Sequence, residues 1–215
     1  MVHSADKYLQ LAETGLLKLS GSRINRMDTH RLRLRRLSES DLKDFHEIWS
    51  NEIATRWSSS GTKKSLQESK AWMHGLLPAN NPDGDNYAVF VRQEEIVISN
   101  CQLLKGVSST VERDERMIGV VGVFRFSPVA ELGYIFHPDV WGRGYATESV
   151  EAFLSIYWKL RPVVKAIQAK TDTENASSIG VLRKCGFREV ARLPGNIVLP
   201  TMGLRDSIVF QIERS

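Results

Sequence analysis

Two glycines, Gly142 and Gly144, stand between a run with the pattern of a strand and a run with the pattern of a helix. The run before them, AELGYIFH at residues 130–137, has the length and the aromatic and β-branched content of a strand. The run after them, from Tyr145 to about Trp158, places apolar residues at helical spacing. The chain must therefore turn from a strand directly into a helix at this point.

Patterns of both kinds alternate along the rest of the chain. Strands are expected at residues 30–37, 87–93, 117–126, 130–137, 164–171, 187–193 and 203–212. Helices are expected at residues 38–50, 63–77, 145–158 and 175–184. Helices interleaved with a central set of strands predict an α/β or α+β domain.

Length and composition indicate one domain. The chain has 215 residues, of which 42% are hydrophobic and 25% charged, and it can bury a sizeable core. Residues 1–28 lie outside the alternating pattern and are expected to be an N-terminal extension without an assigned function, so the domain is expected to span residues 29–215. Residues 93–116 separate two predicted strands and are expected to be an insertion, either an extra hairpin or a loop.

The charge balance is mildly basic, with a formal net charge of +4 and a pI near 9.1. Lysines and arginines are spread along the chain, which argues against nucleic acid as a partner and favours only a mild preference for anionic ligands. The densest basic run alternates Arg31, Arg33 and Arg35 with leucines, and it predicts a half-buried strand with a solvated polar face.

Cysteine content and hydropathy indicate whether the protein binds a metal and in which cellular compartment it is expected. Cys101 and Cys185 are too few and too far apart for a disulfide framework or a zinc site, so no metal is expected and Cys185 is assigned to the core. The sequence contains no signal-like segment and no run of membrane-spanning length, so we expect a cytoplasmic protein without a membrane partner. We expect a monomer or a homodimer.

The glycine turn has the chemistry of an anion site. The first N–H groups of a helix lack intrahelical partners, and the aligned peptide dipoles place about half a positive charge there. Gly142 and Gly144 remove Cβ atoms that would hold an anion away, so N–H groups up to Thr147 can surround a pyrophosphate, with Arg143 adding charge. A tight turn without a ligand is an equally good interpretation. The dinucleotide fingerprint fails, because Thr147 replaces its third glycine, and no Walker lysine is present.

Three segments together resemble a known family. WGRGYATES, after AELGYIFHPDV, resembles the acyl-CoA pyrophosphate loop of the GNAT N-acetyltransferases, with Trp141 in place of the family's Arg or Gln. The residues of this segment are similar to those of the RimJ/RimL-like branch, which acetylates ribosomal-protein N-termini and other amines. HRLRLRRLSESDLKDFHEIWSNEIATRW resembles that branch's opening strand and helix, and NASSIGVLRKCGF resembles its last motif. The segments occur in the family's order, and the resemblance runs from about residue 29 to residue 212.

The resemblance implies a mixed, mostly antiparallel sheet that is splayed between its fourth and fifth strands and flanked by helices. It also implies acetyl-CoA as the cosubstrate, with its pantetheine arm inserted at the splay and its pyrophosphate held by the glycine turn. Asn175 would hydrogen-bond the arm, or it serves only as the N-cap of the last helix. The residues implied to bind the cosubstrate are Phe136, His137, Trp141, Gly142, Arg143, Gly144, Tyr145, Ala146, Thr147, Asn175 and Ser178.

The chemistry implied by the resemblance is direct attack of an amine on the acetyl thioester. An alkyl amine is mostly protonated at neutral pH, whereas a thiolate with a pKa of about 8.5 leaves easily, so a base matters more than an acid. Glu131 aligns with the family's general base, although a strand-edge glutamate is commonly only solvent-facing. His137 is the second candidate base, or a turn histidine held by packing. Leu182 stands where many relatives carry a tyrosine acid, which leaves Ser178, directly or through water, or no acid at all.

The sequence therefore predicts an acetyl-CoA-dependent N-acetyltransferase whose acceptor is an amine of a small molecule or of a protein N-terminus. Acceptor specificity is expected to lie in residues 55–64 and 93–116. Two hypotheses from other classes stay open. One is a non-catalytic acyl-CoA-binding module, which Leu182 supports, and the other is a basic nucleic-acid binder, which the dispersed charge disfavours.

Overall fold

The computed structural model describes residues 25–92, 115–126 and 128–214. In this part of the chain eight strands form one sheet, in the order β1-β2-β3-β4-β5-β6-β8-β7. Neighbouring strands are antiparallel except for β5 and β6, which run parallel. The strands are β1 (Arg26–Asp28), β2 (Leu32–Arg36), β3 (Asp85–Val91), β4 (Met117–Val123), β5 (Ala130–Phe136), β6 (Ala166–Asp172), β7 (Arg188–Leu199) and β8 (Gly203–Glu213).

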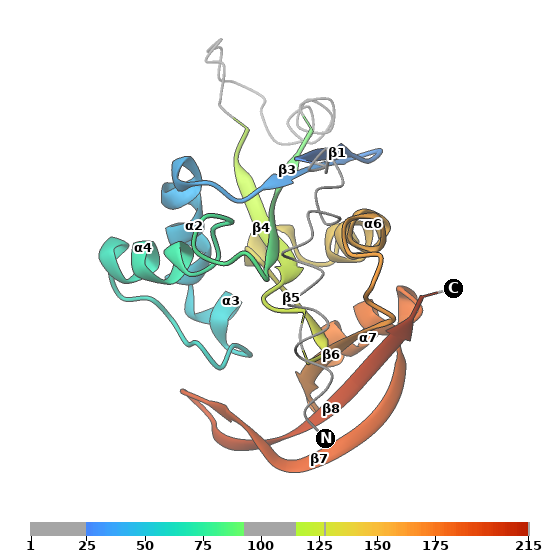
Figure 1. Cartoon of the computed structure of the whole chain (residues 1–215). Helices are drawn as coiled ribbons and strands as arrows, with labels where there is room; N and C mark the ends of the chain where they lie inside the picture. Colours follow the sequence, from blue (N-terminus) through green and yellow to red (C-terminus); the bar gives the residue numbers. More distant parts are fainter. Residues whose placement is uncertain (1–24, 93–114, 127, 215) are drawn as a thin grey trace, which may run out of the picture.

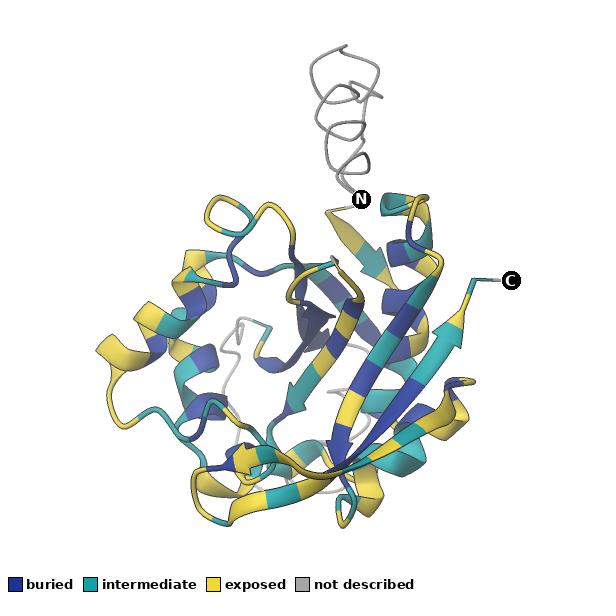
Figure 2. Cartoon of the chain, turned by 60° about the horizontal axis from the view of Figure 1, so that its bottom comes forward, coloured by how far each residue is buried: buried dark blue, intermediate teal, exposed yellow. Residues whose placement is uncertain are grey.

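Helices cover both faces of the sheet (Figure 1). On one face α6 and α7 pack over a core that contains Tyr87, Val121 and Phe153. On the other face α2 and α4 pack over a second core, which contains Phe45 and Met73. Figure 2 shows buried and exposed residues alternating along several strands. The helical elements are η1 (Glu39–Asp41), α2 (Leu42–Trp49), α3 (Glu52–Thr55), α4 (Leu66–His74), η2 (Pro138–Val140), α6 (Tyr145–Leu160) and α7 (Ala176–Lys184).

The sheet splays where β5 meets β6. β4 pairs with β5 from Leu132 to Phe136, whereas β6 pairs with β5 only at Ala130 and Glu131. Most of the β5 edge that faces β6 therefore makes no ladder with it, and the two strands diverge (Figure 1). The resemblance implied a splay between the fourth and fifth strands, and these are β5 and β6 here because β1 precedes the first predicted strand.

The predicted fold class is confirmed, since the sheet is mixed, mostly antiparallel and flanked by helices. The sheet begins earlier than expected, because Arg26–Asp28, inside the expected extension, pairs with β2. Residues 1–24 and nearly all of the expected insertion at 93–116 lie outside the described residues, so both expectations stay predictions. In the part of the chain that the structure describes, no helix is long and apolar enough to cross a membrane.

The C-terminal hairpin is longer than its sequence pattern predicted. β7 continues to Leu199 through Pro194 and Gly195, where its register with β8 shifts. Pro194 has no N–H to donate, but β7 is an edge strand and tolerates the loss. Gly195 adopts a φ of 54°, and its N–H donates to Asp206 at 2.8 Å. Proline and glycine normally end a strand, so the sequence pattern predicted that this strand ends at residue 193, before its end in the structure.

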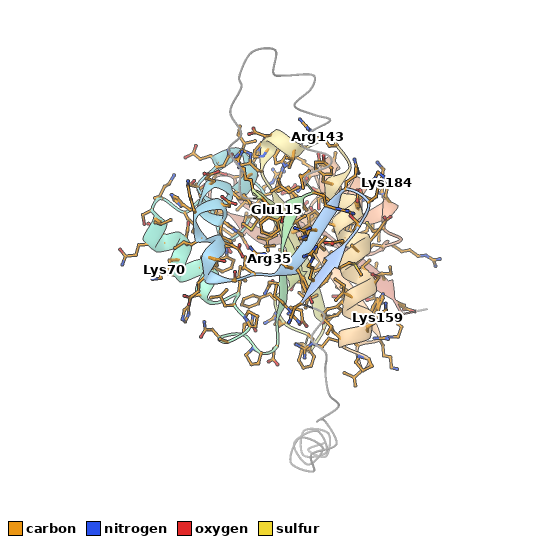
Figure 3. All side chains as sticks on the ribbon, turned by 90° about the horizontal axis from the view of Figure 1, so that it is seen from above. Arg35, Lys70, Glu115, Arg143, Lys159 and Lys184 are labelled. Atoms are coloured by element: carbon orange, nitrogen blue, oxygen red, sulfur yellow. The ribbon has the colours of Figure 1, made fainter. Side chains whose placement is uncertain are left out.

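The arginines of β2 do not form the solvated row that their alternation predicted. Arg33 pairs with Asp28 and with Glu115, and Arg35 pairs with the buried carboxylate of Asp41. Figure 3 shows Arg35 and Glu115 among the side chains over the sheet. Alternation identifies the face on which these cations lie, but not the carboxylates that meet them, of which only Glu115 lies far along the chain.

Candidate active site

A cavity of about 1290 Å³ opens where β5 and β6 separate. Its lining includes residues 131–136 of β5 and residues 169–171 of β6, together with the glycine turn, the first turns of α7 and part of β7. It also reaches Trp49 and Trp72 on the α2 and α4 face of the sheet. A single cavity therefore has walls from both faces of the sheet, joined through the gap between the two strands.

The glycine turn forms one end of this cavity. Gly142 and Gly144 adopt φ values of 75° and 80°, in the left-handed region that favours glycine. A Cβ on Gly142 would meet no heavy atom within 4 Å, so the turn presents open backbone. α6 begins at Tyr145, and its first N–H groups have no partners within the helix. The residues of this region that line the cavity are Trp141, Gly142, Gly144, Tyr145, Ala146 and Thr147.

A long-range brace fixes the turn. The Arg31 Nη1 donates to the Arg143 carbonyl at 2.9 Å, and its Nε donates to Glu148 of α6 at 2.8 Å. Thr29 donates its hydroxyl to the same carboxylate at 2.6 Å. Burial raises the pKa of Glu148, but the hydrogen bonds from Thr29 and Arg31 outweigh it and hold the pKa below its ordinary value. Sequence reasoning missed Arg31 because its partners lie far along the chain.

Arg143 does not reach the cavity with its side chain in the described structure. The residue is exposed and is absent from the described lining, although its carbonyl is held by the brace. Figure 3 shows Arg143 at the edge of the molecule in that view. The direct charge contact expected from Arg143 stays a prediction.

Phe136 and Trp141 act together at the end of β5. The His137 N–H donates to the Ile118 carbonyl at 2.9 Å, and antiparallel strands alternate their bonding groups, so the Phe136 and Tyr134 groups point away from β4, toward the gap. The Phe136 carbonyl accepts from the Trp141 indole N–H at 2.9 Å. Phe136 therefore presents its N–H to the cavity, while its carbonyl is already engaged.

His137 directs its described groups toward the protein rather than toward the cavity, so its suggested roles stay predictions. Its N–H is bonded to Ile118 and its carbonyl accepts from Val140, so its backbone groups are engaged within the protein. Its ring lies 3.3 Å from the Asp139 carboxylate and caps η2, and it is not part of the described cavity lining. The alternative of a turn histidine held by packing describes this geometry.

Asn175 and Ser178 both line the cavity from α7. The Asn175 side-chain oxygen accepts from the Ser178 N–H at 3.1 Å, so Asn175 is the N-cap of the helix. The cap engages the amide oxygen and leaves the amide nitrogen as a second polar group. Leu182, one turn later, is buried and offers no hydroxyl.

Tyr134 is a site residue that sequence reasoning missed. Its hydroxyl oxygen lies 2.7 Å from the Ser178 Oγ and donates to the Ser178 carbonyl at 3.2 Å. Burial raises the pKa of Tyr134 to about 12, although the hydrogen bond with Ser178 opposes the shift. Period-two alternation places Tyr134 on the face of β5 opposite Glu131, and its contact with Ser178 spans 44 positions, so no local pattern indicates it.

Glu131 lies on the cavity wall, at the last position where β5 pairs with β6. Its carboxylate is exposed. It alternates with Leu132, which belongs to the core under α6, and it shares its face with Ile135, which packs against the core under α2. Glu131 thus faces the α2 side of the gap, and Ser178 stands on the α7 side.

The charges around the cavity are mostly positive. Among the described lining residues, Glu131 is the only carboxylate, and the cations are Arg125, Lys170 and Lys184. No group of three or more His, Cys, Asp and Glu residues in the described ranges is arranged to hold a metal ion. Cys185 is buried, and burial raises the pKa of its thiol to about 12, as suits a core residue.

The α2 side of the cavity is aromatic. Trp49, Trp57 and Trp72 line it, together with the serines at 58–60. The rings of Trp49 and Trp72 meet edge to face at 5.4 Å. The Lys63 ammonium lies 5.9 Å and 5.2 Å from their centroids, so this wall already has a cation against its rings.

Comparison with known proteins agrees with this fold. The chain is 22% identical over 162 residues to the uncharacterized N-acetyltransferase p20 of Bacillus licheniformis, which covers 75% of this chain and 81% of the relative. The structure of spermidine N-acetyltransferase from Vibrio cholerae, in complex with CoA and spermine, has a TM-score of 0.67 at 18% identity, covering 87% of this chain and 96% of that one.

A second solved structure is the acetyltransferase from Salmonella typhimurium that modifies the N-terminal serine of a 50S ribosomal subunit protein. It has a TM-score of 0.67 at 17% identity and covers 87% of this chain and 97% of that one. The acetyltransferase (GNAT) domain family matches residues 31–188, which run from β2 to the start of β7 and include the glycine turn, Glu131 and Ser178. The chain belongs to the GNAT acetyltransferase family.

Proposed function

We propose that the protein moves an acetyl group from acetyl-CoA to a primary amine, on a small molecule or a protein N-terminus, by direct transfer in a ternary complex. The observation that carries this proposal is the cavity that spans both faces of the sheet through the gap between β5 and β6. Two molecules can enter such a cavity from opposite faces and meet in the gap.

The cosubstrate seat is proposed at the glycine turn and the free edge of β5. The open backbone at Gly142 and the N-terminus of α6 suit a pyrophosphate. The Phe136 N–H and the Asn175 amide offer polar partners for an extended chain of amides. These groups offer a seat for the pyrophosphate and polar partners for the pantetheine arm of acetyl-CoA, and its thioester supplies the activated acetyl group.

Glu131 is the proposed base. It accepts the proton that the amine loses as its nitrogen bonds to the acetyl carbon, and the carbon–sulfur bond breaks as the sulfur leaves with the electron pair. The Phe136 N–H points into the gap and can polarise the acetyl carbonyl. The products are an amide and a CoA thiolate, which takes its proton from water.

The acceptor that fits this cavity has a single amine on an apolar body. A polyamine would bring several ammonium groups into a described lining with one carboxylate and three cations, where the added charges lack partners. Lys63 already occupies the region beside the Trp49 and Trp72 rings, which weakens the wall's attraction for a further cation. The tryptophans instead offer apolar surface to the body of the acceptor.

A thermal-shift titration tests the cosubstrate seat, with acetyl-CoA and CoA as ligands and ATP as the control. At about a hundred times its dissociation constant, a ligand raises Tm by about 5 to 11 °C in a domain of this size. We expect both CoA compounds to raise Tm and ATP to leave it unchanged. Equal shifts with all three would show a general phosphate site, and the absence of any shift would contradict the proposal.

Turnover separates the enzyme from the second candidate, a non-catalytic acyl-CoA-binding module. Such a module is favoured by the hydrophobic Leu182 at its buried position. It would show the same thermal shift and release no CoA with any amine.

A further inference from the structure

We propose that Tyr134 is a positioning residue for acetyl transfer, which turns the Ser178 hydroxyl toward the departing sulfur. This inference rests on the proposed function and adds a residue to it. It starts from the 2.7 Å contact between the two hydroxyl oxygens, which join β5 to α7 across the wall of the cavity. Both side chains belong to the cavity lining.

The geometry gives Tyr134 two acceptors for one proton. Its O–H can donate to the Ser178 carbonyl at 3.2 Å, and Ser178 then donates its own proton to the tyrosine oxygen. Alternatively, the Tyr134 O–H donates to the Ser178 Oγ, and the serine proton is free to point into the cavity. A rotation of two hydroxyl groups converts one arrangement into the other without any backbone movement.

The second arrangement suits a developing thiolate. A serine hydroxyl alone rotates freely, and fixing its direction makes it a preorganised donor. No proton is transferred from either hydroxyl in this step, since Ser178 only donates a hydrogen bond as the carbon–sulfur bond breaks. Burial keeps the pKa of Tyr134 at about 12, so its hydroxyl stays protonated at neutral pH and remains a donor.

The position of the pair complements that of Glu131. Glu131 shares its face of β5 with residues under α2, whereas Tyr134 reaches α7 on the opposite side. The base therefore lies on one side of the gap and the hydroxyl pair on the other, as a transfer between two substrates requires. Because Leu182 has no polar group, the hydroxyl that supports Ser178 comes from the sheet.

The first test is Tyr134→Phe, which removes one oxygen and keeps the ring. We expect kcat to fall about tenfold, the worth of one hydrogen bond realised in the transition state, with KM for acetyl-CoA unchanged. Tyr157→Phe is the matched control, because the Tyr157 hydroxyl is also buried but has no hydrogen-bond partner among the described residues and is absent from the described cavity lining. This control should keep the wild-type kcat.

The second test asks whether Tyr134 acts through Ser178. In the background of Ser178→Ala, adding Tyr134→Phe should lower kcat no further, since the hydroxyl that it orients is already gone. Ser178→Thr retains a hydroxyl and should recover activity over Ser178→Ala only when Tyr134 is present. Additive losses in the double variant, or an unchanged kcat in Tyr134→Phe, would overturn the proposal.

These outcomes are separable from failure of the proposed function. A wild-type protein that releases no CoA with any amine would contradict both proposals. An active wild type with a fully active Tyr134→Phe variant would overturn only the role of Tyr134. A Tyr134→Phe variant with raised KM for acetyl-CoA and unchanged kcat would also overturn it, because the hydroxyl would then serve binding.

Discussion

At the residue scale, the account depends most on Glu131, the only carboxylate in the described lining of the cavity. Glu131→Gln keeps the size of the side chain and removes its ability to take a proton. We expect kcat to fall about a hundredfold, at the low end for general base catalysis, while the thermal shift with acetyl-CoA stays the same. Glu151→Gln, an exposed change on α6 outside the described lining, is the control. Full turnover by Glu131→Gln would remove Glu131 from the mechanism.

A second residue, Tyr157, tests how the described core is packed. Its hydroxyl is buried and has no hydrogen-bond partner in the part of the chain that the structure describes, and burial together with nearby Asp85 raises its pKa above the ordinary value. Tyr157→Phe removes an unsatisfied polar group, so the free energy of unfolding should rise by about 1 kcal/mol. Chemical denaturation of both proteins measures this difference. A loss of stability would show that the hydroxyl has a partner.

At the element scale, the brace from Arg31 to Glu148 links the start of β2 to the start of α6. Glu148→Gln should lower the free energy of unfolding at neutral pH by about 1 to 2 kcal/mol, because charged hydrogen bonds to Thr29 and Arg31 are weakened. It should also weaken acetyl-CoA binding, since Arg31 holds the Arg143 carbonyl in the glycine turn.

The pH dependence of this difference follows from the lowered pKa of Glu148. A carboxylate with a depressed folded-state pKa stabilises the protein above its unfolded value, ordinarily 4.5, and this stabilisation is lost as the pH falls through the lowered pKa. The difference in the free energy of unfolding between wild type and Glu148→Gln should therefore be at its full size at neutral pH and should disappear below pH 4.5. Thermal unfolding of both proteins across this pH range measures the difference. A difference in stability that grows in acid would contradict the lowered pKa of Glu148.

The aromatic wall beside α2 and α4 yields a prediction about acceptors. A monoamine on an aromatic or aliphatic body should have a kcat/KM at least about tenfold above that of spermidine, since unpaired ammonium groups are costly to bury. Competition between the two amines at a limiting concentration of enzyme gives this ratio directly. A preference for spermidine would show that the described wall is not where the acceptor lies.

At the scale of the whole molecule, features that depend on neighbouring residues could be predicted from the sequence, whereas contacts between distant residues could not. The strand, the glycine turn and α6 follow one another, so their order and the open backbone at Gly142 were predictable from neighbouring residues. The contact of Arg31 with Glu148 spans 117 positions, and that of Tyr134 with Ser178 spans 44. Such contacts depend on the fold as a whole, which explains why neither Arg31 nor Tyr134 was predicted as part of the site.

The same reasoning applies to His137. Its place after β5 suggested a base, but the direction of its backbone groups depends on the pairing of β5 with β4, which engages its N–H. Glu131 lies beside the cavity as part of β5, and Ser178 lies beside it as part of α7, the helix that follows β6. Their chemical roles stay predictions.

The most direct test of the central claim measures CoA thiol released from acetyl-CoA by the purified protein, with and without a panel of monoamines, peptide N-termini and polyamines. The account predicts release that depends on an amine, matched by an equal amount of acetylated amine, and strongly reduced in Glu131→Gln. Binding of acetyl-CoA without amine-dependent release, for every member of the panel, would contradict it.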